Sequence, residues 1–238
     1  MKELLGCIRK ADKDFKLIDD GDTVCVGVSG GKDSLALLYA LALYRRFSPN
    51  KYNLIALTLH LGREPFDLSA IKKLCDEIEV PFVVKHTQIS EIIFDVRKEE
   101  NPCALCAKMR RGALTDACNE LGANKLALGH HRDDAEETLL LSMLYEGRLH
   151  TFHPKTFLSR SGITQIRPMV YASEKHIIHV VKKLSLPVVS SPCPANGFTK
   201  REEVKRIIDD ICRQVPNARE LLLSALQNEA QYGLWNKQ

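Results

Sequence analysis

A glycine-rich turn near the start of the chain has the residues needed to bind phosphate. The stretch Val24–Ser34, VCVGVSGGKDS, runs from an apolar segment into SGGKDS. Glycines let backbone N–H groups approach phosphate oxygens, Ser29 and Ser34 add hydroxyl groups, and Lys32 adds a positive charge. A carboxylate among phosphates repels them unless a cation lies between, so Asp33 predicts Mg²⁺. The turn differs from the common P-loop, which has one more residue before its Gly-Lys pair. A plain tight turn is the alternative, and the strand–turn–helix context disfavours it.

A second polar group lies in GHHRDD, residues 129–134, directly after an apolar stretch. Carboxylates at the start of a helix favour its dipole, so helix capping is one explanation for Asp133 or Asp134. His130 and His131 are residues that bind metals, but adjacent residues of a strand point to opposite faces, which disfavours a shared metal. We expect the segment to face the same crevice as the glycine turn, because both follow strands.

Three of the eight cysteines stand apart from the rest. Cys103 and Cys106 form a C-x-x-C that enters a helix, and Cys193 lies between two prolines after an apolar stretch. Such a pair can be half of a zinc site, a redox pair or half of an iron–sulfur site. A closed zinc site needs four ligands, and three thiolates with an open corner suit chemistry better. The others fit buried apolar positions in helices or strands: Cys7, Cys25, Cys75, Cys118 and Cys212.

The elements that position these residues alternate between strand and helix, which predicts parallel βαβ units in a doubly wound α/β sheet. Strands are expected at residues 23–29, 52–60, 81–86, 125–131 and 187–190, with a hairpin that turns at Ser161-Gly162. Helices are expected at 3–18, 32–46, 68–79, 109–121, 133–145, 174–183, from 199, and within 217–238. We therefore expect one domain with a C-terminal helical extension.

The chain has 238 residues, a formal net charge of +4 and a pI of about 8.6, and its composition is that of a globular protein. This charge permits a polyanionic partner without requiring one. The N-terminus has no secretory apolar region, and the longest apolar run, residues 35–44, is too short to span a bilayer. We expect a cytoplasmic protein with no membrane partner, in which the cysteines do not form a disulfide framework.

The SGGKDS turn resembles the PP-loop of the ATP pyrophosphatases. This resemblance implies a doubly wound, mostly parallel sheet of the adenine nucleotide alpha-hydrolase type. It also implies that the enzyme adenylates a substrate and releases pyrophosphate. An N-terminal helix would occupy residues 1–21, the PP-loop domain 22–198 and the extension 199–238. The nucleotide-binding residues it implies are Ser29, Gly30, Gly31, Lys32, Asp33, Ser34, His60, Gly129 and His130.

The order CALC, RRG, GHHRDD, ETL, IRPM and a late cysteine resembles the bacterial tRNA 2-thiocytidine synthetase family over residues 24–197. In that family three cysteines hold a [4Fe–4S] cluster whose fourth iron is free to carry sulfur. The resemblance implies this role for Cys103, Cys106 and Cys193, and a role for Asp133 or Asp134 in metal binding or adenylation. Asn196 replaces the second cysteine of the family's late C-x-x-C, which is not one of these three ligands.

The implied reaction is an ATP-dependent thiolation of a tRNA base, with cytidine in the anticodon loop as the expected target. Its catalytic residues would be Lys32, Asp33, Asp133 and Asp134, and its cofactors ATP, Mg²⁺ and a [4Fe–4S] cluster. A cysteine desulfurase or free sulfide would donate sulfur, and a homodimer could enlarge the RNA-binding surface. Further basic residues are candidates for phosphate or RNA contacts, or else form surface ion pairs: Arg110, Arg111 and Arg167.

Several alternatives stay open at the level of sequence. Another base, such as uridine, could be thiolated, or a cysteine persulfide could carry the sulfur without a cluster. Amide or lysidine-type ligation would fit GHHRDD alone, but the three cysteines argue against it. A zinc-bound RNA-binding module without catalysis is the alternative from another class, and the intact Lys32 and Asp33 argue against that.

Overall fold

The computed structural model describes residues 1–62, 67–98, 102–189 and 200–228. The chain divides into two compact units. Unit 1 is Met1–His131 with His153–Asn196, and unit 2 is Arg132–Phe152 with Gly197–Gln238. Cys193 and Asn196 lie outside the described residues. Across the described ranges, no helix is both long enough and apolar enough to span a bilayer.

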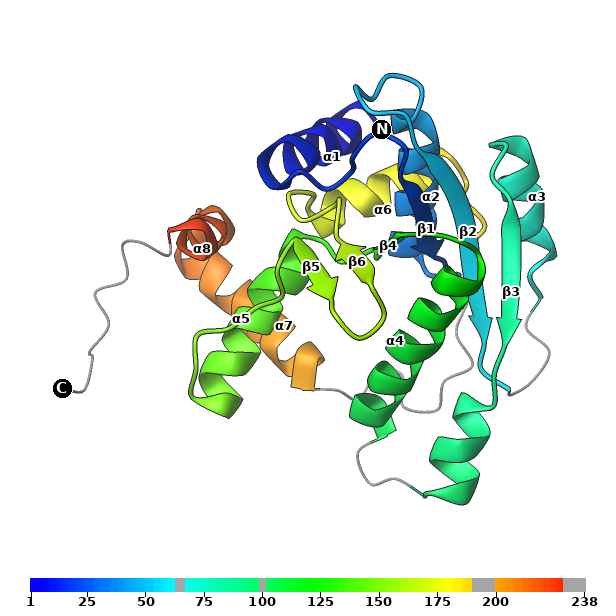
Figure 1. Ribbon diagram of the computed structural model, residues 1–238. Helices are drawn as coiled ribbons and strands as arrows, with labels where there is room; N and C mark the ends of the chain where they lie inside the picture. Colours follow the sequence, from blue (N-terminus) through cyan, green and yellow to red (C-terminus); the bar gives the residue numbers. More distant parts are fainter. Residues whose placement is uncertain (63–66, 99–101, 190–199, 229–238) are drawn as a thin grey trace. The chain divides into compact units, whose positions relative to one another are not determined.

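Unit 1 is built on a six-stranded sheet with the strand order β3-β2-β1-β4-β6-β5 (Figure 1). The neighbouring strands are parallel apart from β5 and β6, which form the antiparallel hairpin predicted from the sequence. The expected doubly wound, mostly parallel sheet is confirmed. The strands are β1 (Thr23–Gly27), β2 (Asn53–His60), β3 (Phe82–His86), β4 (Lys125–Ala127), β5 (Lys155–Leu158) and β6 (Ile163–Ile166).

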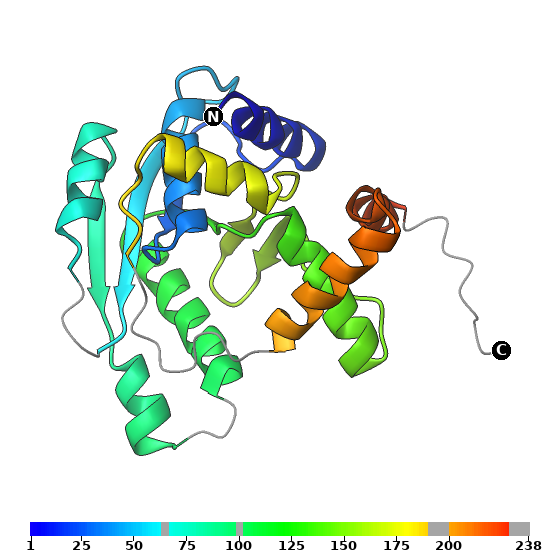
Figure 2. The ribbon, with the colours of Figure 1, turned by 180° about the vertical axis from the view of Figure 1, so that it is seen from behind.

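Helices cover both faces of this sheet (Figures 1 and 2). On one face α4 (Pro102–Glu120) buries Cys118 against Cys25 and Leu126 of the strands. On the other face lies α2 (Lys32–Tyr44), against which α1 (Lys2–Phe15) and α6 (Glu174–Lys183) pack. Because β1 has β2 on one side and β4 on the other, the strand order reverses there, and such a switch point is where open α/β sheets bind ligands.

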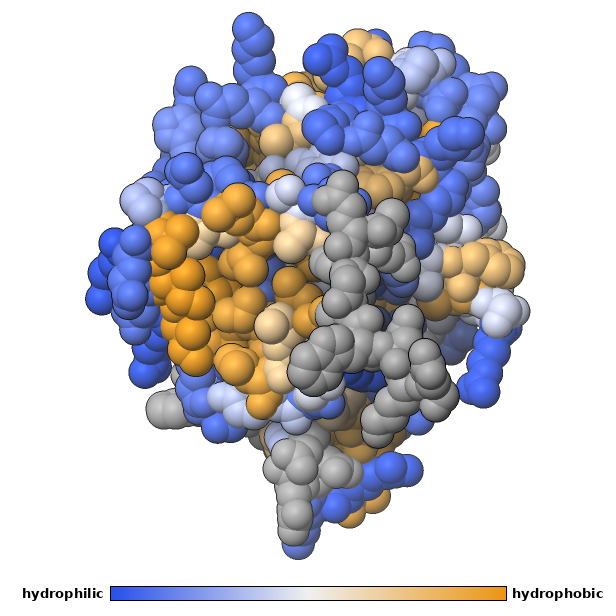
Figure 3. Space-filling model, turned by 90° about the vertical axis from the view of Figure 1, so that its left-hand side faces the viewer, coloured by the Kyte–Doolittle hydropathy of each residue, from blue (hydrophilic) through white to orange (hydrophobic). Residues whose placement is uncertain are grey.

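Unit 2 contains α5 (Arg132–Glu146), α7 (Lys200–Gln214) and α8 (Ala218–Gln227). Leu140, Val204 and Ile208 form its buried core, which confirms a helical C-terminal region. Hydrophobic side chains gather in one area of the molecular face shown in Figure 3. Among the described residues of unit 2, the exposed large apolar side chains are Met143, Leu144, Tyr145, Leu149, Ile207, Ile211, Val215 and Leu221.

One strand prediction is wrong. Residues 187–189 form no strand, although they belong to an apolar stretch, residues 186–189, that is bounded by serines. Pro187 has no N–H to donate to a ladder, and the Val189 N–H donates at 3.0 Å to the Gly30 carbonyl in the glycine turn. The segment therefore lies against the turn without joining the sheet.

The remaining differences concern the extent of the elements. β1 and β4 end at Gly27 and Ala127, before the predicted ends at residues 29 and 131. α4 begins at Pro102, seven residues before the predicted start, so it includes the C-x-x-C. α8 ends at Gln227, and residues 229–238 of the predicted tail helix lie outside the described residues. The described part of unit 1 also contains α3 (Ser69–Glu77), which packs against β3, and a π-helix, η1 (Glu91–Val96), for which the sequence shows no periodic pattern.

Candidate functional site

The glycine turn links β1 to α2 and is held open by its own serine hydroxyls. Gly30 has φ +83°, a conformation that glycine adopts at little cost. The buried Ser34 hydroxyl donates to the Gly31 carbonyl at 2.9 Å and accepts from the Ser29 N–H at 3.1 Å. Ser34 therefore fixes the shape of the turn, while the first N–H groups of α2 remain at its mouth, where they suit an anion.

Lys32 lies between two carboxylates at the mouth of this turn. Its ammonium is 3.0 Å from Asp33 Oδ2 and 3.1 Å from Glu174 Oε1 at the start of α6. Burial lowers the pKa of Lys32, but Asp33 and Glu174 outweigh it and hold the pKa above its ordinary value. Glu174 was missed by the sequence analysis, because a glutamate in the first turn of an amphipathic helix is typical of a solvated surface.

The segment after β4 reaches the same turn. His131 is buried, pairs with Met169 in an isolated parallel bridge, and has its Nε2 3.7 Å from Asp33 Oδ1. Gly129 lies so close that a Cβ there would be 3.0 Å from the Asp33 carbonyl carbon and 3.1 Å from the Ser34 nitrogen. Unit 1 thus brings GHH and SGGKDS together, as the sequence predicted, and His130 is half-buried beside them.

Gly129→Ala should therefore displace the turn. The three atoms nearest to the new methyl group all belong to the backbone of Asp33 and Ser34, so the start of α2 must move by a few tenths of an ångström. We expect ATP affinity to fall at least tenfold, and the free energy of unfolding to fall by about 1–3 kcal/mol, the usual cost of overpacking. Isothermal titration and urea denaturation measure the two effects. Gly6→Ala, where nothing lies within 4 Å of the added Cβ, is the control, and equal behaviour of both variants would contradict the prediction.

His60 ends β2 at the carboxyl edge of the sheet. Its Nδ1 accepts a hydrogen bond from the Gly62 N–H at 3.3 Å, and its ring lies 5.1 Å from that of His86, the last residue of β3. β2 pairs with β3 on one side, where His60 lies beside His86, and with β1 on the other side, where Leu57 lies beside Gly27. His60 is thus on the same edge as the glycine turn, and its expected contact with adenosine stays a prediction.

The C-x-x-C begins α4 in unit 1. Cys103 is exposed and Cys106 half-buried, and their spacing of three residues places both thiols on one face of the helix. Further along α4, Arg110 and Arg111 are exposed. Arg167 is buried after β6, where it donates to the His153 carbonyl at 2.5 Å. Burial and the charge of Arg111 lower the pKa of Arg167 to about 10. Because Arg167 is buried, it does not belong to an ion pair on the surface.

The two aspartates of GHHRDD open α5 in unit 2, and each pairs with an arginine of the C-terminal helices. Asp133 is buried and lies 3.1 Å from Arg219 of α8, which also donates to Glu136 at 2.8 Å. Asp134 is more exposed and lies 3.6 Å from Arg201 of α7. These pairs involve residues 67 and 86 positions apart, and no local sequence pattern indicates them. They show that α7 and α8 hold the start of α5.

Glu136 should make the stability of the protein depend on pH. Burial, and then the charge of Asp133, raises the pKa of this fully buried carboxyl to about 7 from an ordinary 4.5. A raised carboxyl pKa means that folding favours the neutral acid, so stability is lost as the pH rises from about 4.5 to 7.

Glu136→Gln should remove most of that loss, which is on the order of 3 kcal/mol at 1.36 kcal/mol per pKa unit. Urea denaturation of both proteins at pH 5 and pH 8 measures it. Glu220→Gln, at an exposed position of the same unit, is the control. Parallel stability curves for the wild type and Glu136→Gln would show the prediction to be wrong.

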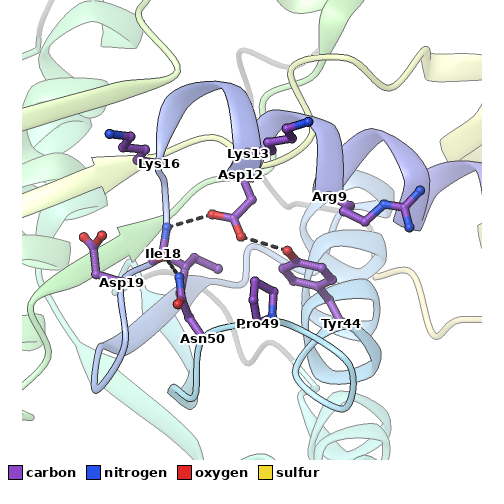
Figure 4. A pocket seen from close by; sticks show the side chains of 9 residues that line it. All are labelled: Arg9, Asp12, Lys13, Lys16, Ile18, Asp19, Tyr44, Pro49 and Asn50. Carbon is purple, nitrogen blue, oxygen red and sulfur yellow. Dashed lines mark hydrogen bonds between the residues drawn. The ribbon is translucent and has the colours of Figure 1, made fainter.

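A separate hollow of about 460 Å³ lies at the opposite edge of the sheet, under α1 (Figure 4). There the buried Asp12 accepts hydrogen bonds from the Ile18 N–H at 2.9 Å and the Tyr44 hydroxyl at 2.8 Å. Asn50 also lines the hollow, and its side-chain amide donates a hydrogen bond to the Ile18 carbonyl at 2.5 Å. These contacts tie α1 to α2, and the hollow contains none of the predicted site residues.

Two groups of side chains fit the inorganic cofactors that the sequence implied. Asp33 Oδ1 is a buried oxygen that accepts no hydrogen bond from the described residues, which suits a cation that binds oxygen ligands. Cys103 and Cys106 present two accessible thiols on one helical face, which suits an iron–sulfur cluster. In the part of the chain that the structure describes, no three histidine, cysteine or acidic residues form a metal cluster, and the third predicted thiol, Cys193, lies outside it.

The sheet order and the SGGKDS turn define a nucleotide-binding α/β protein of the PP-loop class. The family described as "PP-loop domain" matches residues 7–208, and the chain belongs to this family. Among curated relatives, the tRNA-cytidine(32) 2-sulfurtransferase of Pelobacter propionicus is 37% identical over 95% of this chain and 86% of its own length. The relative of the same name from Geobacter metallireducens is 38% identical over 95% and 90%.

A solved structure agrees with these relatives. The U34-tRNA thiolase NcsA from Methanococcus maripaludis, described with its [4Fe–4S] cluster, matches with a TM-score of 0.78 and 25% identity. The match covers 100% of this chain and 80% of that one. The resemblance to ATP-dependent tRNA thiolases is therefore confirmed at the level of sequence family and fold.

Proposed function

We propose that the protein is an ATP-dependent tRNA sulfurtransferase that replaces the C2 oxygen of a cytidine in the anticodon loop with sulfur. One observation carries this proposal. A chain with an intact SGGKDS turn and an accessible C-x-x-C matches, over 95% of its length, relatives named for that reaction. The PP-loop family is ATP-dependent, which agrees with the geometry of the turn.

The glycine turn would hold the phosphates of ATP. The N–H groups at the start of α2 would face these phosphates, and Lys32 contributes a positive charge that its two carboxylate partners preserve. Asp33 would hold Mg²⁺ through its buried Oδ1, and the cation would neutralise charge on the phosphates when bound. His60, Gly129 and His130 would line the nucleoside side of the crevice.

The reaction then consists of two displacements. The C2 oxygen of the base attacks the α-phosphate of ATP, and pyrophosphate leaves. Sulfur at the sulfide level, as hydrosulfide, then attacks C2 and loses its proton, and the oxygen departs with AMP, so each thiolated base accounts for one ATP. Lys32 stabilises the charge that develops on the phosphate in the first step. Asp133 or Asp134 is expected to assist the adenylation, and the arginine pairs in unit 2 support a fixed carboxylate geometry.

The thiols would serve the second displacement. Cys103, Cys106 and Cys193 would hold a [4Fe–4S] cluster, which supplies Lewis-acid and sulfur-carrying chemistry when bound. The cysteine spacing on α4 and the cluster of the structurally similar thiolase support this assignment over a persulfide. The buried Cys25 and Cys118 contact each other on the far side of α4 from solvent and are not candidates.

Cytidine is favoured over uridine as the base. The relatives named for cytidine are 37% and 38% identical, whereas the thiolase named for uridine is 25% identical. A base must leave its stack to reach a crevice of this kind, so an anticodon loop is a suitable substrate.

Anaerobic incubation with tRNA, ATP, Mg²⁺ and sulfide tests the proposal. Digestion of the RNA and mass analysis of its nucleosides should find 2-thiocytidine formed only when ATP is present. Thiouridine in its place would transfer the proposal to another base. If no thiolated nucleoside forms with a protein that contains its iron, the proposal is wrong.

Three further expectations belong to this proposal. A cysteine desulfurase or free sulfide would donate the sulfur. A homodimer would bury apolar residues such as Ile207, Ile211 and Leu221 on α7 and α8, and sedimentation measures its mass. The division into residues 1–21, 22–198 and 199–238 likewise stays a prediction.

A further inference from the structure

The ion pair between Lys32 and Glu174 joins two parts of unit 1 that are far apart in the sequence. Lys32 opens α2 directly after the glycine turn, and Glu174 opens α6, 142 residues later. Their charged atoms are 3.1 Å apart, with 32% of the Lys32 side chain and 19% of the Glu174 side chain exposed. The pair is therefore more sheltered than a fully exposed ion pair, which solvent and salt screen.

The structure fixes Glu174 on both sides. Ser173 caps α6 by accepting a hydrogen bond from the His176 N–H at 3.3 Å, which determines where the first turn points. α6 packs along α2, and the chain after α6 returns to the glycine turn, where Val189 bonds the Gly30 carbonyl. The segment from Glu174 to Val189 thus contacts the turn at its beginning and at its end.

Asp33, the second carboxylate that pairs with Lys32, would also bind Mg²⁺ in the proposed function. Asp33 Oδ2 lies 3.0 Å from the Lys32 ammonium, and its Oδ1 is the buried oxygen suited to a cation. A carboxylate that binds a cation holds an ammonium less strongly, because the two positive charges repel each other. Glu174 is the carboxylate that carries no such second charge, so it is the stronger partner of Lys32. On the other side of Asp33, the imidazole Nε2 of His131 lies 3.7 Å from Oδ1.

We propose that Glu174 is a positioning residue, which holds the Lys32 ammonium at the mouth of the glycine turn so that it meets the phosphate undergoing attack. This rests on the proposed function for the identity of the substrate. Ground-state ATP binding depends mainly on the backbone N–H groups of the turn, whereas Lys32 acts on charge that develops in the transition state. Loss of Glu174 should therefore lower kcat more than it raises KM.

The first test needs neither RNA nor catalysis. Nucleotide-free wild type, Glu174→Gln and Glu174→Asp are acylated with an amine reagent under one set of conditions, and the peptide containing Lys32 is quantified by mass spectrometry. Because the Glu174 carboxylate lies 3.1 Å from the Lys32 ammonium and holds it against α6, the Gln variant should acylate Lys32 at least threefold faster than wild type, and the Asp variant less so. Glu3→Gln is the matched control. It removes a carboxylate of α1 that pairs with His176, a residue on the same helix as Glu174.

The second test measures ATP-dependent pyrophosphate release in the presence of tRNA. Glu174→Gln should lower kcat about tenfold or more with KM for ATP within threefold of wild type, and Glu174→Asp should recover part of the loss. Unchanged Lys32 acylation in Glu174→Gln would overturn the inference, and so would equal defects in the Gln and Asp variants. If the wild type releases no pyrophosphate at all, the proposed function fails, while the acylation test still decides the role of Glu174.

Discussion

Asp33→Asn should reduce ATP-dependent thiolation by at least about 10²–10³-fold, the range seen when one essential electrostatic contact of a transition state is removed. Asparagine keeps the size of the side chain but removes the charge that would hold Mg²⁺ beside the phosphates. It also deprives Lys32 of the carboxylate that lies 3.0 Å away. Pyrophosphate release measures the loss directly, because it reports the first displacement.

The iron content of Asp33→Asn should equal that of wild type, since Asp33 and the thiols of α4 serve different displacements. Asp76→Asn, an exposed aspartate in α3, is the matched control and should retain full activity. An Asp33→Asn protein that releases pyrophosphate at the wild-type rate would contradict the role given to the turn. Raising Mg²⁺ should not rescue the variant, because a neutral amide is a much weaker ligand for this cation.

Cys103→Ser and Cys106→Ser should each abolish thiolation and lower the iron and sulfide bound per chain. A serine hydroxyl is not a thiolate, and clusters of this class are held by cysteine thiolates. Protein purified without oxygen should contain about four irons and four sulfides in the wild type, with the visible absorption of a [4Fe–4S] cluster. Cys193→Ala should behave in the same way, as the third predicted ligand.

Cys7→Ser is the control for these variants. Cys7 is half-buried in α1, and its thiol contacts the Tyr171 carbonyl at 3.5 Å, a contact that a hydroxyl can also make. Its iron content and activity should match those of wild type. One zinc per chain in place of iron, or full thiolation by Cys103→Ser, would mean that the thiols do not hold a cluster, and a persulfide or a structural zinc site would then explain them.

The site features that the sequence could predict are local. SGGKDS lies within six residues, and a short apolar strand followed by a helix with leucines at helical spacing is enough to place the turn at the end of β1. The alternation of strands and helices predicted the parallel sheet for the same reason. The edge hairpin was predicted as well, because Ser161-Gly162 interrupts two short apolar stretches.

The features that the sequence could not predict depend on contacts between distant residues. Glu174 reaches Lys32 across 142 positions, and Arg219 reaches Asp133 across 86. Neither glutamate nor arginine carries a signal at those places, since both are typical of exposed helix faces. The strand predicted at 187–190 failed in a related way, because the Val189 N–H donates to the turn rather than to a neighbouring strand.

Transfer of the base's own oxygen tests the central claim most directly. A tRNA whose C2 carbonyl oxygen at the target cytidine is ¹⁸O is incubated with the iron-loaded protein, ATP and sulfide, and the AMP is examined by mass spectrometry. The account predicts one ¹⁸O in AMP for each 2-thiocytidine formed, because the oxygen that attacks the α-phosphate leaves with it. Thiolation with unlabelled AMP would contradict adenylation of the base, and the role assigned to the glycine turn would have to be abandoned.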